Sequence, residues 1–131
     1  MSLILEKIQQ RLMSKGDLGI SAPLYISDKS DFKRNITDFM TAFREYYPNY
    51  NIGYSFKTNY CRDFIDVVRE VGGYAEVVSP AEYQLARNCG FEDCEIIYNG
   101  VIPDTEDKIR CANHGGIVNI CLLYTSPSPR D

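Results

Sequence analysis

Long apolar runs are missing from this sequence of 131 residues, and no stretch approaches the roughly 18 consecutive apolar residues of a membrane-spanning helix. A signal peptide is also missing, because Glu6 and Lys7 stand where such a peptide needs an apolar core. Basic residues are not in excess, since 14 basic and 18 acidic residues give a net charge of −4, which disfavours a nucleic-acid partner. These absences predict a cytoplasmic protein without membrane or nucleic-acid partners.

Closely paired cysteines are absent as well. Five cysteines occur, an odd number, and no two of them form a CxxC pair. Because a structural zinc site needs four ligands in closely spaced pairs, we expect reduced thiols and no metal site. The only histidine, His114, lies in the sequence NHGG, where we expect a solvated or capping side chain rather than a catalytic one.

Residues 121–131 read CLLYTSPSPRD and resemble a translated sequencing adapter. The alternative is a genuine disordered terminus rich in proline and serine. We expect a non-native, adapter-derived tail, which is excluded from the reasoning on the fold. The chain is then expected to be a piece of a longer protein whose natural sequence continues differently after Ile120.

The amino-terminal part divides into two segments. Residues 1–21 are expected to be a helix over residues 3–13 and a lead-in, and residues 22–27 read as a strand. A longer helix should follow, with Ser30 as N-cap and Pro48 beyond its end. Its apolar residues recur at the spacing of one helical face: Phe32, Ile36, Phe39, Met40 and Phe43.

A repeat occupies the rest of the chain. Short apolar strands start at Tyr54, Ala75, Ile96 and Ile117, and each start lies 21 residues after the one before. Helical patterns separate these strands, marked by Phe64, Val67 and Val68 in the first and by Ile109 and Ala112 in the third. The second helix opens with SPAE, in which Ser79, Pro80 and Glu82 fit a capping box with proline at the first helical position.

Strand–helix–strand units of this kind predict parallel strands with right-handed crossovers, and therefore an α/β fold. Leucine-rich repeats have a similar period, but the leucine ladder that they need is absent. A doubly wound sheet is possible, whereas the compact units favour a TIM-type (β/α)8 barrel, which typically needs about 250 residues. We therefore expect residues 22–120 to form a truncated barrel, its first four βα units.

Alternation along the first strand of the repeat sends Tyr54 and Phe56 to one face, and Ser55 and Lys57 to the other. In a barrel, Ser55 and Lys57 would point inward, with Lys57 at the carboxyl end of the strand, where barrel enzymes have their active sites. Glu76 of the next strand should share this interior. A structural lysine that reaches solvent from the end of the strand is the alternative.

The motifs PLYISD, YSFKTN, GGYAEVVSPAEYQLARNCGF and IIYNG occur in an order and spacing that resemble the amino-terminal half of the barrel domain in fold-type III pyridoxal-phosphate decarboxylases. Ornithine, arginine and diaminopimelate decarboxylases belong to this family. The resemblance implies pyridoxal 5'-phosphate as cofactor, with Lys57 forming the internal aldimine and Ser55 and Glu76 beside it. It also implies a small amino-acid substrate and a homodimer for the full-length protein, and an inactive 131-residue chain, because the family's other working parts come later.

Two departures from the family pattern concern the substrate. Glu76 is one methylene longer than the usual aspartate, and residues 101–104 read VIPD where relatives often carry polar residues and lysine. A pyridoxal-phosphate racemase is an alternative, although the KANAYG-like run typical of alanine racemases is missing. A non-catalytic cofactor-binding protein of the same barrel fold is another.

Overall fold

The computed structural model describes residues 6–10, 27–100 and 105–120. Residues 6–10 are helical, in agreement with the predicted first helix. The rest of that helix, residues 22–26 of the predicted strand, the 101–104 segment and the 121–131 tail lie outside the described residues. The elements follow in the order α2 (Lys29–Tyr46), β1 (Gly53–Ser55), α3 (Arg62–Glu70), β2 (Tyr74–Val77), α4 (Pro80–Asn88), the 3-10 turn η1 (Asp93–Glu95), β3 (Ile96–Tyr98), α5 (Thr105–Asn113) and β4 (Ile117–Val118).

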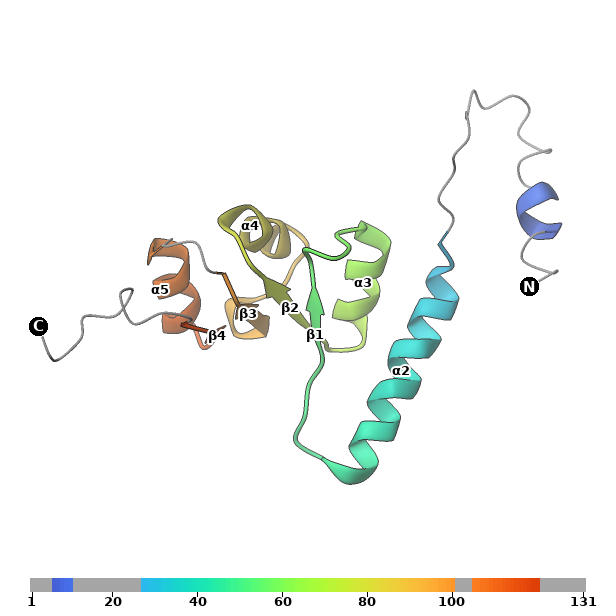
Figure 1. Ribbon diagram of the computed structural model, residues 1–131, viewed down its shortest axis with the longest axis horizontal. Coiled ribbons are helices and arrows are strands. Elements are labelled where there is room, and N and C mark those ends of the chain that lie inside the picture. The colour runs from blue at the N-terminus through green and yellow to red at the C-terminus, as the bar shows by residue number, and fades with distance from the viewer. Residues whose placement is uncertain (1–5, 11–26, 101–104, 121–131) are drawn as a thin grey trace, which may run out of the picture.

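The four strands form one parallel sheet in the order β1-β2-β3-β4 (Figure 1), which confirms the predicted parallel arrangement. Helices α3, α4 and α5 connect neighbouring strands in turn. Crossovers between parallel strands are right-handed. Since the strands follow one another across the sheet in chain order, such crossovers put all three connecting helices on the same face of the sheet. This is the arrangement expected of consecutive units of a barrel, and it leaves the other face, here called the open face, without connecting helices.

The core lies between the sheet and its helices. Alternate strand residues that face the helices are fully buried, namely Ala75, Val77, Ile96 and Tyr98, and the helices contribute Ile65, Val67, Val68, Tyr83 and Ala86. Phe56 follows β1 and is also completely buried, with its ring 6.1 Å from that of Phe91. The predicted alternation is therefore confirmed for the side of the strands that faces the helices.

Helix α2 begins earlier than predicted. Its N-cap is Asp28 rather than Ser30, because the Asp28 carboxylate accepts hydrogen bonds from two backbone N–H groups, at 2.8 Å from Ser30 and 3.1 Å from Asp31. The helix ends at Tyr46, two residues before Pro48, as predicted. Among the residues that the structure describes, no helix is both long and apolar enough to cross a membrane.

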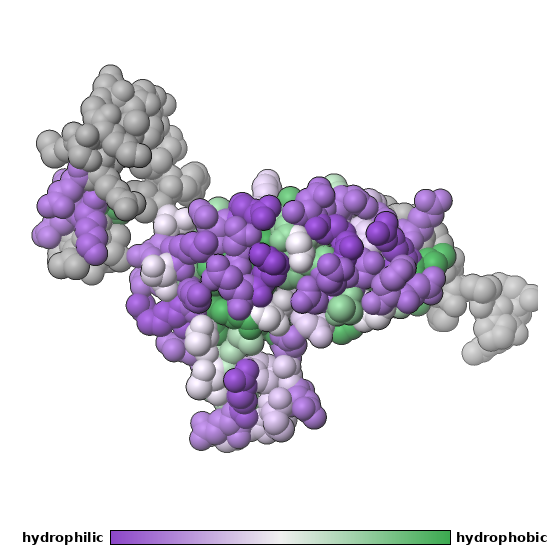
Figure 2. All heavy atoms as spheres, turned by 180° about the vertical axis from the view of Figure 1, so that it is seen from behind, coloured by the Kyte–Doolittle hydropathy of each residue, from purple (hydrophilic) through white to green (hydrophobic). Residues whose placement is uncertain are grey.

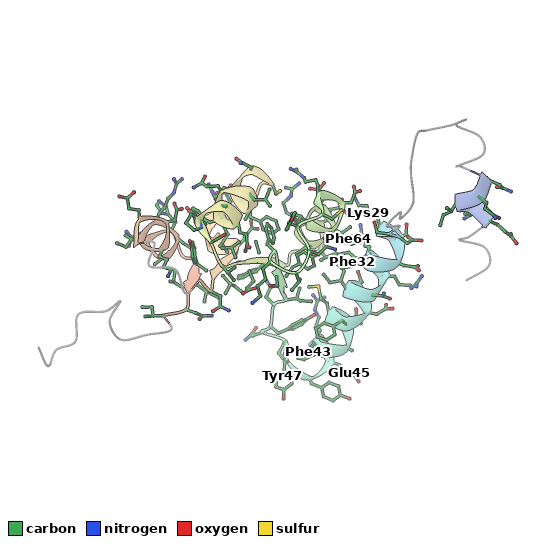
Figure 3. All side chains as sticks on the ribbon, turned by 45° about the horizontal axis from the view of Figure 1, so that its top comes forward. Lys29, Phe32, Phe43, Glu45, Tyr47 and Phe64 are labelled. Atoms are coloured by element: carbon green, nitrogen blue, oxygen red, sulfur yellow. The ribbon has the colours of Figure 1, made fainter. Side chains whose placement is uncertain are left out.

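The predicted apolar face of α2 is only partly covered. Phe32 packs on α3, with its ring 4.5 Å from that of Phe64 (Figure 3), and Ile36 is buried. Phe39 and Phe43 are 50% and 42% exposed, because the carboxyl-terminal half of α2 extends beyond α3 (Figure 1). Figure 2 shows the whole molecule from behind, and hydrophilic residues predominate on the side that this view presents.

Two helices differ in detail from the prediction. In α4 the Ser79 hydroxyl accepts from the backbone N–H of Glu82 at 3.3 Å, but the Glu82 carboxylate accepts from Val78, at 2.9 Å, instead of closing a capping box. In α5 the buried residue is Cys111, whereas Ile109 is 53% exposed. Since each residue turns a helix by 100°, Ile109 lies on the far side of α5 from Cys111.

Candidate active site

The open face of the sheet carries one row of side chains that are neighbours in register. Ser55 of β1 pairs with Glu76 of β2, Glu76 pairs with Ile97 of β3, and Ile97 pairs with Ile117 of β4. Since successive strand residues alternate, these side chains lie on the opposite face from the buried core. The structure therefore brings together Ser55 and Glu76 as the sequence predicted.

Lys57 lies in a turn over residues 56–58, directly after β1, and not within the strand as the sequence predicted. Hydrogen bonds hold the turn on both sides: Phe56 N–H donates to the Glu76 carbonyl at 3.0 Å, and Thr58 donates to the Ser55 carbonyl through its N–H at 3.2 Å and its hydroxyl at 2.7 Å. This anchoring places Lys57 at the carboxyl end of the sheet, the end at which barrel enzymes bind their substrates.

The Lys57 side chain is exposed, and within the described part of the chain no ion pair joins it to Glu76. This exposed position agrees with the alternative in which a structural lysine reaches solvent from the end of the strand. The reason is its position: Lys57 lies in a turn beyond the last residue of β1, where the described residues leave it exposed. Exposure keeps the ε-amino group accessible to an incoming carbonyl compound.

Ser55 is the unusual polar group of the site. Its hydroxyl oxygen is buried, yet it has no hydrogen-bond partner among the residues that the structure describes. Buried hydroxyl groups are normally paired, because an unpaired one costs free energy. A buried hydroxyl without a partner, beside an anchored lysine turn, is therefore suited to a ligand that accepts or donates a hydrogen bond there.

Glu76 is partly buried and has a side-chain partner that the sequence reasoning missed. The Asn99 amide nitrogen donates to Glu76 Oε1 at 3.1 Å, and the Asn119 amide nitrogen donates to Asn99 Oδ1 at 3.3 Å. Both asparagines directly follow strands, β3 and β4. The signal was available, because Asn99 stands two residues after Ile97 and so continues the open-face alternation.

A second polar cluster lies at the other end of the strands. Asp93 is 6% exposed and accepts a hydrogen bond from the Tyr83 hydroxyl at 2.6 Å. Two arginines and a histidine surround the same carboxylate, with Arg87 Nε at 3.5 Å, Arg110 Nε at 3.8 Å and His114 Nδ1 at 3.7 Å. Because Asp93 precedes β3, this cluster lies at the amino end of the sheet, where barrel residues stabilise the fold rather than bind substrates.

His114 also has the capping role that the sequence predicted. Its Nδ1 lies 2.8 Å from the carbonyl oxygen of Arg110, in the last turn of α5. Since a carbonyl only accepts, Nδ1 carries the hydrogen. The described cysteines, Cys61, Cys89, Cys94 and Cys111, are free thiols, as expected, and Cys121 lies outside the described residues.

The fold and the site together define a class of protein: the first parallel units of a barrel domain, with a lysine turn, a serine and a carboxylate at the carboxyl end of its strands. Residues 33–123 match the family model described as the pyridoxal-binding domain of pyridoxal-dependent decarboxylases. The chain therefore belongs to this family, and the resemblance drawn from its motifs is confirmed.

Individual relatives agree with this assignment. A probable chloroplastic diaminopimelate decarboxylase of Oryza sativa subsp. japonica is 33% identical over 98 residues, which cover 75% of this chain and 20% of that protein. A diaminopimelate decarboxylase of Methanothermobacter thermautotrophicus is 30% identical over 78 residues, or 60% of this chain and 18% of that protein. The chain thus spans about a fifth of the length of these relatives.

A solved structure shows the same fold. The crystal structure of diaminopimelate decarboxylase from M. jannaschi superposes with a TM-score of 0.61 and 22% identity, over 78% of this chain and 25% of that one. The expected fold class, a partial α/β barrel, is therefore confirmed, and the doubly wound sheet is not needed to explain the strand order.

Proposed function

We propose that this chain is part of a pyridoxal-phosphate-dependent amino-acid decarboxylase of the diaminopimelate or ornithine decarboxylase type, in which Lys57 binds the cofactor covalently. The observation that carries the proposal is the anchored Lys57 turn beside a buried Ser55 hydroxyl without a partner among the described residues. Pyridoxal phosphate, when bound, supplies the aldehyde and the electron sink that decarboxylation needs. The named relatives are diaminopimelate decarboxylases, which favours a diamino acid as the substrate.

The residues of the site fit this cofactor. The Lys57 ε-amino group is exposed at the carboxyl end of β1, so it can reach an aldehyde from solvent. The Ser55 hydroxyl would gain a hydrogen-bond partner from the bound group. Glu76 is a register neighbour of Ser55, and its backbone carbonyl accepts from Phe56 of the Lys57 turn, so its carboxylate would add a negative charge on the face that binds the cofactor.

The rest of the catalytic apparatus is expected elsewhere in the full-length protein, together with a homodimer. In the part of the chain that the structure describes, the open face has no opposite wall to exclude water and orient a substrate. We therefore expect the 131-residue chain to bind the cofactor at Lys57 without releasing carbon dioxide from diaminopimelate or ornithine.

The experiment is to incubate the chain with pyridoxal phosphate, reduce it with borohydride, and identify the modified lysine by peptide mass spectrometry. We expect Lys57 to be the main site of modification, and the Lys57→Ala variant to lose most of the label. Lys29→Ala is the matched control, because Lys29 is an exposed lysine at the start of α2 (Figure 3) and the label should stay on Lys57 in this variant.

Two results would contradict the proposal. One is a label spread evenly over the exposed lysines. The other is an equal loss of label in Lys57→Ala and Lys29→Ala, since this would mean that Lys57 reacts only as a surface amine.

A further inference from the structure

A chain of side-chain amides crosses three strands at the carboxyl end of the sheet and ends on Glu76. Asn119, after β4, donates to Asn99 Oδ1 at 3.3 Å, and Asn99, after β3, donates to Glu76 Oε1 at 3.1 Å. The backbone fixes the same residues, because Asn99 N–H donates to the Val77 carbonyl at 2.7 Å and Asn119 N–H donates to the Tyr98 carbonyl at 2.9 Å. Each asparagine thus continues the ladder of the sheet.

The direction of these bonds follows from their chemistry. An ionised carboxylate only accepts hydrogen bonds, so the Asn99 group that faces Glu76 is its NH2. The Asn99 carbonyl oxygen then faces Asn119, whose NH2 is the matching donor. The two side-chain hydrogen bonds therefore run in the same direction, with each NH2 donor pointing toward the negative charge of Glu76.

We propose that Asn99 is a positioning residue, which orients the Glu76 carboxylate on the open face beside the Lys57 turn. A glutamate has one more rotatable bond than an aspartate, so an unrestrained Glu76 carboxylate would sample more positions on an uncovered face. A hydrogen bond from the Asn99 amide to a charged acceptor is stronger than one between neutral groups and holds Oε1. Asn99 acts on the site through Glu76.

This inference rests on the proposed function, because the orientation of Glu76 matters through its effect on the nitrogen of Lys57. A nearby carboxylate stabilises the protonated form of a cationic nitrogen. With Asn99 in place, the adduct of Lys57 and pyridoxal phosphate should therefore hold its proton to higher pH.

The first measurement is a pH titration of the visible absorbance of this adduct in the 131-residue chain. In Asn99→Leu, which removes the amide at similar volume, we expect the proton affinity of the adduct to fall roughly tenfold. Asn99→Gln retains the NH2 donor and should recover much of this loss. Asn88→Leu makes the same change at an exposed asparagine at the end of α4 and should leave the titration unchanged.

A double mutant separates positioning from a general effect on the fold. In the Glu76→Gln background, Asn99→Leu should change the titration no further, because the carboxylate through which Asn99 acts is gone. The inference would be overturned if Asn99→Leu changed the titration equally in both backgrounds, or if it had no effect in the parent chain. A label on Lys57 would leave the proposed function intact in either case.

The second measurement needs no cofactor and decides the matter if Lys57 forms no adduct. The NMR resonances of the Asn99 side-chain NH2 should shift on Glu76→Gln, while those of Asn88 stay unchanged. An Asn99 signal that does not respond to Glu76→Gln would show that the hydrogen bond is absent, and the inference would fail independently of the proposed function.

Discussion

The Ser55 hydroxyl provides a test in which a single substitution should move two measurements in opposite directions. The hydroxyl is buried and has no partner within the described part of the chain. A buried polar group left unpaired costs about 1–3 kcal/mol. Ser55→Ala removes this group and loses little packing, so we expect the free energy of unfolding of the cofactor-free chain to rise by about 1 kcal/mol.

A matched control deletes the same atom from another strand-to-helix segment. The Ser79 hydroxyl caps α4 by accepting from the Glu82 N–H at 3.3 Å. Ser79→Ala should therefore lower the free energy of unfolding by about 1 kcal/mol, a typical loss for an N-cap. Urea denaturation followed by circular dichroism compares both variants with the parent chain. A loss of stability in Ser55→Ala equal to that in Ser79→Ala would refute the reasoning.

The cofactor supplies the second half of the test. If the Ser55 hydroxyl bonds to bound pyridoxal phosphate, Ser55→Ala should weaken labelling of Lys57 roughly twofold to tenfold, corresponding to a hydrogen bond of about 0.5–1.4 kcal/mol. Unchanged labelling, measured as the cofactor concentration for half-maximal modification, would remove Ser55 from the proposed binding site.

Two further predictions concern the fold. Tyr83→Phe should lower the free energy of unfolding by about 1.5–3 kcal/mol, because it deletes the buried 2.6 Å hydrogen bond to the ionised Asp93. Urea denaturation measures this loss, and an unchanged denaturation midpoint would contradict the prediction. Burial, together with the nearby charge of Asp93, raises the pKa of the Cys111 thiol from an ordinary value of 9.0 to about 11. Between these values only the unfolded chain releases the thiol proton, so stability should fall as the pH rises from about 9 to about 11. The slope of stability against pH over this interval should be smaller in Cys111→Ala, and equal slopes would contradict the assignment.

The repeat is the part of the fold that could be predicted from the sequence most directly. Strands were expected to begin at Tyr54, Ala75, Ile96 and Ile117, and the structure begins them within one residue of these positions. Such a prediction succeeds because strand alternation and helix-ending glycines act over a few neighbouring residues. The same alternation put Ser55 and Glu76 on one face, where their register pairing confirms them as neighbours.

The sequence did not determine two features that depend on distant segments, and it misplaced one local helix end. The predicted apolar face of α2 includes Phe39 and Phe43, but both remain exposed in the carboxyl-terminal half of the helix. The N-cap moved to Asp28 because a carboxylate that accepts two N–H groups competes successfully with a hydroxyl. Whether Lys57 is exposed depends on which other segments cover the open face, and the local sequence around β1 does not determine this.

By itself, the sequence determined the period of the units, the parallel sheet, the faces of the strands and the family to which the motifs belong. Tertiary structure alone decided which side chains meet. The bond from Asn99 to Glu76 joins residues 23 positions apart, and the Asp93 cluster joins α4 to α5. Local patterns report the conformation of a segment, whereas a polar contact between segments also depends on the register and twist of the sheet between them.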